Sequence, residues 1–203
     1  MKKMLVILVV LAMTGVASAE LLSANRGFEL GDMTDWLQWG AGGGSGYQDW
    51  NDVTTVINDG TAHSGDYYVQ MDQFAPPGDW AYSVMWQGEA SPVAAGPGDY
   101  TFSAWARSAD TAQALLKLEY WDNNTATFLD QLEVLIPIVA DDTWQFVSNT
   151  FTAPAGTNGL RAVIGGNSGT FSVDYDDVSV VAVPEPATLA LLGLGGLFLR
   201  RKK

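Results

Sequence analysis

Short segments in which apolar and polar side chains alternate recur along most of this chain. In residues 114–121, Ala114, Leu116, Leu118 and Tyr120 alternate with the residues at positions 115, 117, 119 and 121. A period of two is the pattern of a β-strand with one buried face. Clusters of Gly, Pro, Asn and Asp separate these segments about every ten residues, a spacing typical of β-sandwiches. The pattern predicts an all-β fold, an antiparallel β-sandwich.

The alternation also predicts where the individual strands lie. We expect strands over residues 53–57, 67–71, 81–87, 100–107, 114–121, 131–138, 144–152, 160–164 and 170–181. The Gly-rich segment 40–46 is expected to be a loop. Residues 20–182 have no convincing helical period, and their number is normal for one domain with a single core.

The first nineteen residues have the composition of a targeting segment. Lys2 and Lys3 precede an apolar block at residues 4–13, and small residues follow at 17–19. This order is typical of a secretory signal peptide, which predicts cleavage before Glu20. The alternative is a permanent N-terminal anchor, but the apolar block is short for a membrane span. We therefore assign residues 1–19 to a signal peptide.

The C-terminal segment, residues 183–203, has the composition of a membrane anchor. An apolar run at 187–199, expected to be a short hydrophobic helix, ends in four cations at 200–203. The cations resist transfer across a bilayer and favour its cytoplasmic side. A stable span needs about 20 apolar residues, so the run favours a transient anchor or one that is removed.

The same segment resembles a known sorting signal. Pro184, Glu185 and Pro186 precede the apolar run, and Arg200 and Arg201 begin the basic end. These three parts, in this order, resemble the PEP-CTERM signal of Gram-negative bacteria. The resemblance implies export by the secretion machinery, recognition by an exosortase while the segment is in the inner membrane, and delivery to the cell surface or extracellular matrix. It implies no activity for the domain.

The domain between these ends is strongly acidic. Of 23 acidic residues only Glu185 lies in the ends, whereas the domain keeps only four basic residues, Arg26, Arg107, Lys117 and Arg161. Its net charge of about −18 excludes nucleic acid as a partner, because phosphate binding requires Lys and Arg. The chain has no cysteine, which excludes disulfides, thiolate metal sites and a thiol nucleophile.

The domain also resembles the galactose-binding-like jelly rolls that serve as carbohydrate-binding modules. Residues 25–31 begin the match, residues 62–65 and 100–103 continue it, and residues 151–156 and 175–180 complete it. The resemblance implies a jelly-roll sandwich and a structural calcium ion where the two ends of the domain meet.

The resemblance assigns Glu29 to this calcium site, together with Asp176 or Asp177. Alternation does not decide which of the two aspartates points inward. The alternative is that all three are ordinary solvated acids. An acidic domain without disulfides would gain stability from an ion held by carboxylates.

Exposed aromatic rings are the expected platform for a sugar, because a ring can stack on the apolar face of a pyranose. The candidate carbohydrate ligands are Trp39, Tyr47, Trp50, Trp105 and Trp121. The alternative for each of these rings is packing in the core. We assign the other three tryptophans, Trp36, Trp86 and Trp144, to the core or to its border. If residues 100–107 and 114–121 pair as a hairpin, Trp105 and Trp121 lie at its opposite ends.

Catalytic motifs are weak in this sequence. His63 is the only histidine, and no Ser lies in a Gly-x-Ser-x-Gly elbow. We therefore expect no enzyme but an exported surface or matrix protein with a carbohydrate-binding domain. Two alternatives stay open: a purely structural matrix protein without a sugar site, and a polysaccharide-active enzyme that uses two of the many carboxylates.

Overall fold

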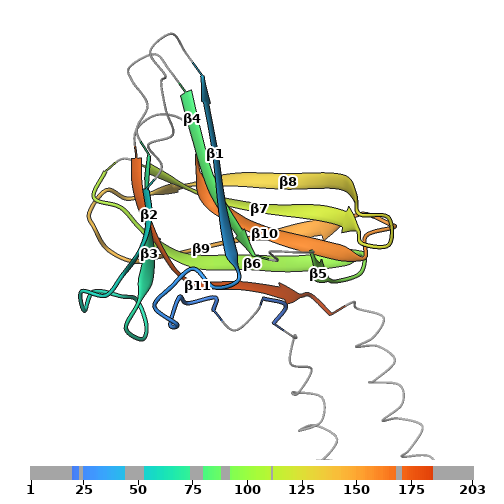
Figure 1. The fold of residues 1–203 in the computed structure, drawn as a ribbon, viewed down its shortest axis with the longest axis horizontal. Coiled ribbons are helices and arrows are strands. Elements are labelled where there is room, and N and C mark those ends of the chain that lie inside the picture. The colour runs from blue at the N-terminus through green and yellow to red at the C-terminus, as the bar shows by residue number, and fades with distance from the viewer. Residues whose placement is uncertain are drawn as a thin grey trace, which may run out of the picture.

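A computed structural model describes residues 20–22, 25–43, 53–73, 80–87, 92–110, 112–167 and 171–184. The signal peptide and most of the sorting segment, residues 185–203, lie outside the described residues. Figure 1 shows two layers of strands, and the described residues contain no helix. Accordingly, none of them forms a helix of the length and hydropathy that a bilayer crossing needs.

Eleven strands form two antiparallel sheets within the described residues. They are β1 (Trp36–Gly43), β2 (Val53–Ile57), β3 (Tyr68–Gln73), β4 (Trp80–Gln87), β5 (Val93–Ala94), β6 (Gly98–Arg107), β7 (Ala112–Asp122), β8 (Thr127–Ile138), β9 (Gln145–Ala153), β10 (Gly159–Asn167) and β11 (Phe171–Ala182). One sheet has the order β1-β4-β10-β7-β8, with β5 beside β10. The other has the order β2-β3-β11-β6-β9. The fold is the all-β jelly-roll sandwich that the sequence predicts.

The core lies between the two sheets and follows the alternation of the strands. Inward-facing residues of β6 and β7 are fully buried: Phe102, Ala104, Ala106, Leu116, Leu118 and Tyr120. Burying one large apolar side chain stabilises a fold by about 1.5–3 kcal/mol. With no disulfide, this core and the hydrogen-bonded ladders hold the sheets together.

The observed strands agree with the nine predicted segments except at some ends. One difference is β1, which runs through Gly40 to Gly43 where a loop is expected, because those residues pair with residues 80–83 of β4. The two-residue strand β5 is a further addition. The segments 100–107 and 114–121 do not pair: β6 and β7 lie in different sheets. Trp105 and Trp121 therefore belong to different sheets.

A bulge in β11 places two acidic side chains near one loop. The pairing of β11 with β6 shifts register between Asp176 and Ser179, and Asp177 has a φ of 48°. Regular alternation would point neighbouring side chains to opposite faces. Here both carboxylates reach the loop at residues 63–64 instead. The bulge therefore lets both Asp176 and Asp177 face the same loop, and which of them would hold a metal stays a prediction.

Candidate functional site

The outer face of the six-stranded sheet combines aromatic and charged side chains. Alternation turns five residues of β4, β7 and β10 away from the core: Trp86, Lys117, Glu119, Trp121 and Arg161. We call this set the tryptophan–arginine face. The strand register brings its members together, since Arg161 pairs with Glu119, and Val163 lies between Trp86 and Lys117.

An apolar floor lies beside this set on the same sheet. Val84, Leu115 and Val163 form a buried cluster separate from the main core, with Trp86 and Leu135 packed against it. Leu115 is completely buried although its neighbours Ala114 and Leu116 face the core. An outward-facing side chain without exposure shows that this part of the sheet is covered and dry, which strengthens polar interactions near it.

Arg161 joins the two tryptophans. Its guanidinium carbon lies 4.8 Å from the ring centroid of Trp121 and 5.6 Å from that of Trp86. Both separations are within the range of a cation–π contact. Glu119 holds the cations in place: its oxygens lie 3.5 Å from Arg161 Nη1 and 3.2 Å from Lys117 Nζ. The indole N–H of Trp121 donates to Glu119 over 3.4 Å.

Two donors of this face have no hydrogen-bond partner among the described residues, Trp86 Nε1 and Arg161 Nε. A buried donor without an acceptor costs free energy, and these two atoms meet a ligand oxygen only if the side chains around them move. Phe128 of β8 extends the aromatic surface, with its ring centroid 5.6 Å from that of Trp121. The face therefore offers aromatic rings for stacking, with the charged groups of Arg161, Lys117 and Glu119 beside them.

The structure separates the predicted carbohydrate ligands. Trp121 belongs to the tryptophan–arginine face, whereas Trp105 lies on the outer face of the five-stranded sheet. Trp39 pairs with Val84 through its backbone, and its side chain is outside the description. Tyr47 and Trp50 lie outside the described residues, so their roles stay predictions.

The core assignments hold for Trp36, which is buried. Trp86 packs against the buried cluster of Val84, Leu115 and Val163, which agrees with a place at the border of a core, but this cluster lies on the outer face of its sheet. Sequence reasoning did not include Trp86, Arg161, Glu119 or Lys117 among the site residues. One signal for them was available, because alternation already placed residues 117, 119 and 121 on one side of a strand. The alternation within one segment could not show that Trp86 of β4 and Arg161 of β10 lie beside these residues.

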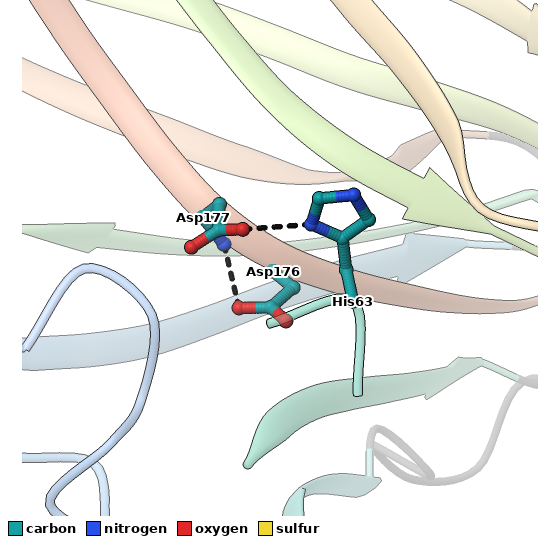
Figure 2. A group of neighbouring side chains, drawn as sticks. All are labelled: His63, Asp176 and Asp177. Carbon is teal, nitrogen blue, oxygen red and sulfur yellow. Dashed lines mark hydrogen bonds and ion pairs between the residues drawn. The ribbon is translucent and has the colours of Figure 1, made fainter. Parts of the chain in front are cut away.

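Two of the three predicted calcium residues, Asp176 and Asp177, lie at the β11 bulge. His63, Asp176 and Asp177 form a group whose ligand atoms all lie within 4.8 Å of one another. Figure 2 shows the His63 ring projecting toward Asp177, with Asp176 beside them, and His63 Nδ1 lies 2.8 Å from Asp177 Oδ2. The backbone N–H of Ser64 donates to Asp176 over 3.0 Å, and its hydroxyl donates to Asp177 over 2.8 Å.

Glu29 binds the same loop a few residues further on. Its carboxylate accepts hydrogen bonds from the backbone N–H groups of Asp66, over 3.0 Å, and Tyr67, over 3.2 Å. A Cβ on Gly65 would clash with this carboxylate, and the φ of 61° at Gly65 also favours glycine. A Cβ on Gly27 would lie 3.5 Å from oxygens of both Asp176 and Asp177. The second contact is an ordinary van der Waals distance, so only Gly65 is needed for the approach of a carboxylate, that of Glu29.

Burial makes Asp176 the strained member of this group. Its side chain has no solvent exposure, and burial raises its pKa to about 6, with the charge of Asp177 acting in the same direction. Hydrogen bonds from backbone N–H groups oppose the rise. The oxygens of Asp176 and Asp177 are ligands of the kind that Ca²⁺ prefers, whereas the nitrogen of His63 is not, and Glu29 does not belong to this close group.

A comparison with protein families identifies the C-terminal segment. Residues 182–203 match the model of the PEP-CTERM protein-sorting motif. The chain carries this motif. The match covers the end of β11 and the segment after it, and it describes sorting rather than the activity of the sandwich. No curated protein matches the chain significantly.

The sandwich is similar to solved carbohydrate-binding modules. One of them is TmCBM61 in complex with β-1,4-galactotriose, with a TM-score of 0.53 at 17% identity. The match covers 82% of this chain and 100% of the TmCBM61 chain. The CBM22-1 xylan-binding domain of Paenibacillus barcinonensis Xyn10C has a TM-score of 0.57 at 14% identity, over 83% of this chain and 97% of that one.

A third similar structure belongs to a larger protein. The enzymatically active domain of bacteriophage CBA120 tailspike protein 4 has a TM-score of 0.57 at 15% identity over 80% of this chain. This chain spans only 22% of that domain's length. At such identities these likenesses show the jelly-roll fold and no more.

Proposed function

We propose that this protein is a non-catalytic, polysaccharide-binding protein of the cell surface or extracellular matrix of a Gram-negative bacterium. The signal peptide takes it to the secretion machinery, and the sorting segment holds it in the inner membrane for an exosortase. The sorting motif at residues 182–203 supports this route. The similarity to carbohydrate-binding modules supports the role of the sandwich.

The tryptophan–arginine face is the proposed binding site. The observation that carries the proposal is the contact of Arg161 with both Trp86 and Trp121, beside two unpartnered donors. The rings would stack on apolar sugar faces while Arg161, Lys117 and Glu119 orient hydroxyl groups. Glu119 offsets one of the two cations, and the net charge of about −18 on the domain disfavours an anionic polymer, so an uncharged polysaccharide suits the site.

Truncating either tryptophan is expected to weaken binding. Trp121→Ala and Trp86→Ala should each lower the affinity about tenfold, the loss of roughly 1.4 kcal/mol of stacking and burial. Affinity electrophoresis and isothermal calorimetry, with β-1,4-galactan and xylan as first probes, measure the change.

Leu30→Ala is the matched control, because Leu30 is 59% exposed and belongs to a loop rather than to this face. If the wild type binds neither these glycans nor those of a broader array, that result would instead favour the purely structural matrix protein. Release of reducing ends from a bound glycan would favour the enzyme.

We also propose that Ca²⁺ binds at Asp176, Asp177 and Glu29. The ion would offset the repulsion of the two aspartates and the burial of Asp176, tying β11 to the loop at residues 63–67. Without the ion, a carboxyl group with a pKa raised to about 6 favours the folded state only when protonated. Its contribution to stability is therefore lost as the pH rises from about 4 through 6.

Calcium is expected to raise the melting temperature. An ion at 100 times its Kd adds about 2.7 kcal/mol, or roughly 5–10 °C for a domain of this size. The rise should be larger at pH 7 than at pH 5, and Asp176→Asn should remove most of it. Scanning calorimetry with calcium and with a chelator measures both effects. An equal melting temperature under the two conditions at pH 7 would contradict the site.

A further inference from the structure

The outer face of the five-stranded sheet presents a second aromatic group on regular rows of hydroxyl side chains. In the register of β6 with β9, Trp105 pairs with Phe146, Ser103 with Ser148, and Thr101 with Thr150. These residues alternate with buried ones such as Ala104 and Val147, so all six belong to the outer face. We call them the phenylalanine–hydroxyl strip.

Phe146 is the most informative member of the strip. Its side chain is 60% exposed, and it belongs to β9, which is an edge strand of its sheet. A large exposed aromatic residue on a sheet edge is an association liability unless it has a use. Its ring contacts that of Trp105 edge to face, at 5.5 Å between centroids and 61° between planes.

Trp105 is held rigidly in this arrangement. One face of its indole is covered by the imidazole of His63, at 3.8 Å between centroids and 16° between planes. His63 is itself held by Asp177 of β11. A ring fixed by its neighbours loses little rotational freedom when a ligand stacks beside it, which favours binding.

The chemistry of the strip selects its partner. Its three rows contain two aromatic rings and four hydroxyl groups. Beside Trp105 lie the carboxylate of Asp176, which is its partner in the register of β11 with β6, and that of Asp177, which holds His63. Such a surface offers stacking and hydrogen bonds but no attraction for an anionic polymer. A second copy of this chain, with a net charge of about −18 in its domain, would be repelled. An uncharged polysaccharide remains as the fitting occupant.

We propose that the phenylalanine–hydroxyl strip is a second polysaccharide-binding site, so that one domain bridges two glycan chains. The two sheets form opposite layers of the sandwich, and the two sites face away from each other (Figure 1). Bridging rests on the proposed function of the tryptophan–arginine face. It gives the matrix protein a physical role, which is cross-linking of polysaccharide.

A two-glycan capture assay tests this proposal with the full-length protein. Protein is bound to beads that carry β-1,4-galactan or xylan, whichever binds more tightly, and then offered the same glycan in soluble fluorescent form. The wild type should capture label. Phe146→Ala should stay on the beads but capture about five- to tenfold less label, because one stacking contact is lost. Trp121→Ala should lose capture similarly, and Leu30→Ala should not.

The pattern of results separates the two proposals. If Phe146→Ala captures as much label as wild type while Trp121→Ala does not bind beads, the second site is overturned and the proposed function stands. If Trp121→Ala alone binds the beads and captures label as the wild type does, the tryptophan–arginine face is not a glycan site, and the proposed bridge between two glycans is overturned as well. If sedimentation gives a wild-type dimer that Phe146→Ala dissolves, the strip binds a second copy, which overturns a glycan site. Phe146 is exposed, so an unchanged melting temperature should accompany its truncation.

Discussion

Replacing Arg107 by alanine is expected to lower the free energy of unfolding by about 3–5 kcal/mol, the cost of leaving a buried charge without its partner. Arg107 Nε lies 2.7 Å from Asp174 Oδ2, and both side chains are only 9% exposed. The guanidinium also lies 4.7 Å from the ring centroids of Tyr68 and Trp144 and donates to Thr61.

Asp174 explains why the loss is large. Burial raises the pKa of this carboxyl group even though Arg107 stabilises its charged form. Without Arg107 the carboxylate keeps a hydrogen bond from Gln70, over 3.2 Å, but no cation in direct contact. It must then take up a proton or force β11 to open, and each costs free energy.

Urea unfolding at pH 7, followed by circular dichroism, measures the loss. The control is Arg26→Ala, because Arg26 pairs with Glu20 at the surface, with side-chain exposures of 49% and 24%. That pair should contribute less than about 1 kcal/mol. Asp174→Asn should cost less than Arg107→Ala, because the amide oxygen of asparagine can still accept from Arg107, and Asp142 lies 3.8 Å from Arg107 Nε. Equal losses for Arg107→Ala and Arg26→Ala would contradict a stabilising role for the buried pair.

Alternation predicted most of the fold because it is a local property. Residues 100–107 and 114–121 each show which side chains share a face, and the structure places those faces as expected. Residues 40–43 gave no such signal, since three of the four are glycines, which have no side chain to alternate. Their pairing with β4 is set by the register that begins at Trp36 and Gln87.

The candidate site depends on sheet order, which alternation does not contain. Lys117, Glu119 and Trp121 could be grouped from one segment, but Arg161 reaches them because β10 lies between β4 and β7. The bulge at Asp177 was equally hidden. A positive φ at an aspartate follows from the packing of β11 against β6 and the loop at 63–64, not from the sequence near it.

A second large loss of stability is expected for Tyr175→Phe, about 2–4 kcal/mol. Tyr175 lies on β11 and is fully buried. Its hydroxyl reaches the opposite sheet, where it accepts a hydrogen bond from the N–H of Leu115, over 2.9 Å, and donates to the carbonyl of Gly165, over 2.5 Å. Removing one oxygen leaves two buried backbone groups without partners, at about 1–3 kcal/mol each.

Tyr100→Phe is the matched control for this loss. Its hydroxyl donates one hydrogen bond, over 2.6 Å, to the carbonyl of Gly96, which is exposed and can turn to water. We expect that change to cost about 1 kcal/mol. If Tyr175→Phe costs no more, Leu115 and Gly165, which face each other in the register of β7 and β10, have closed the gap themselves. Because Leu115 belongs to the floor beside the tryptophan–arginine face, glycan affinity should fall with stability if the gap stays open. It should be unchanged if the strands close.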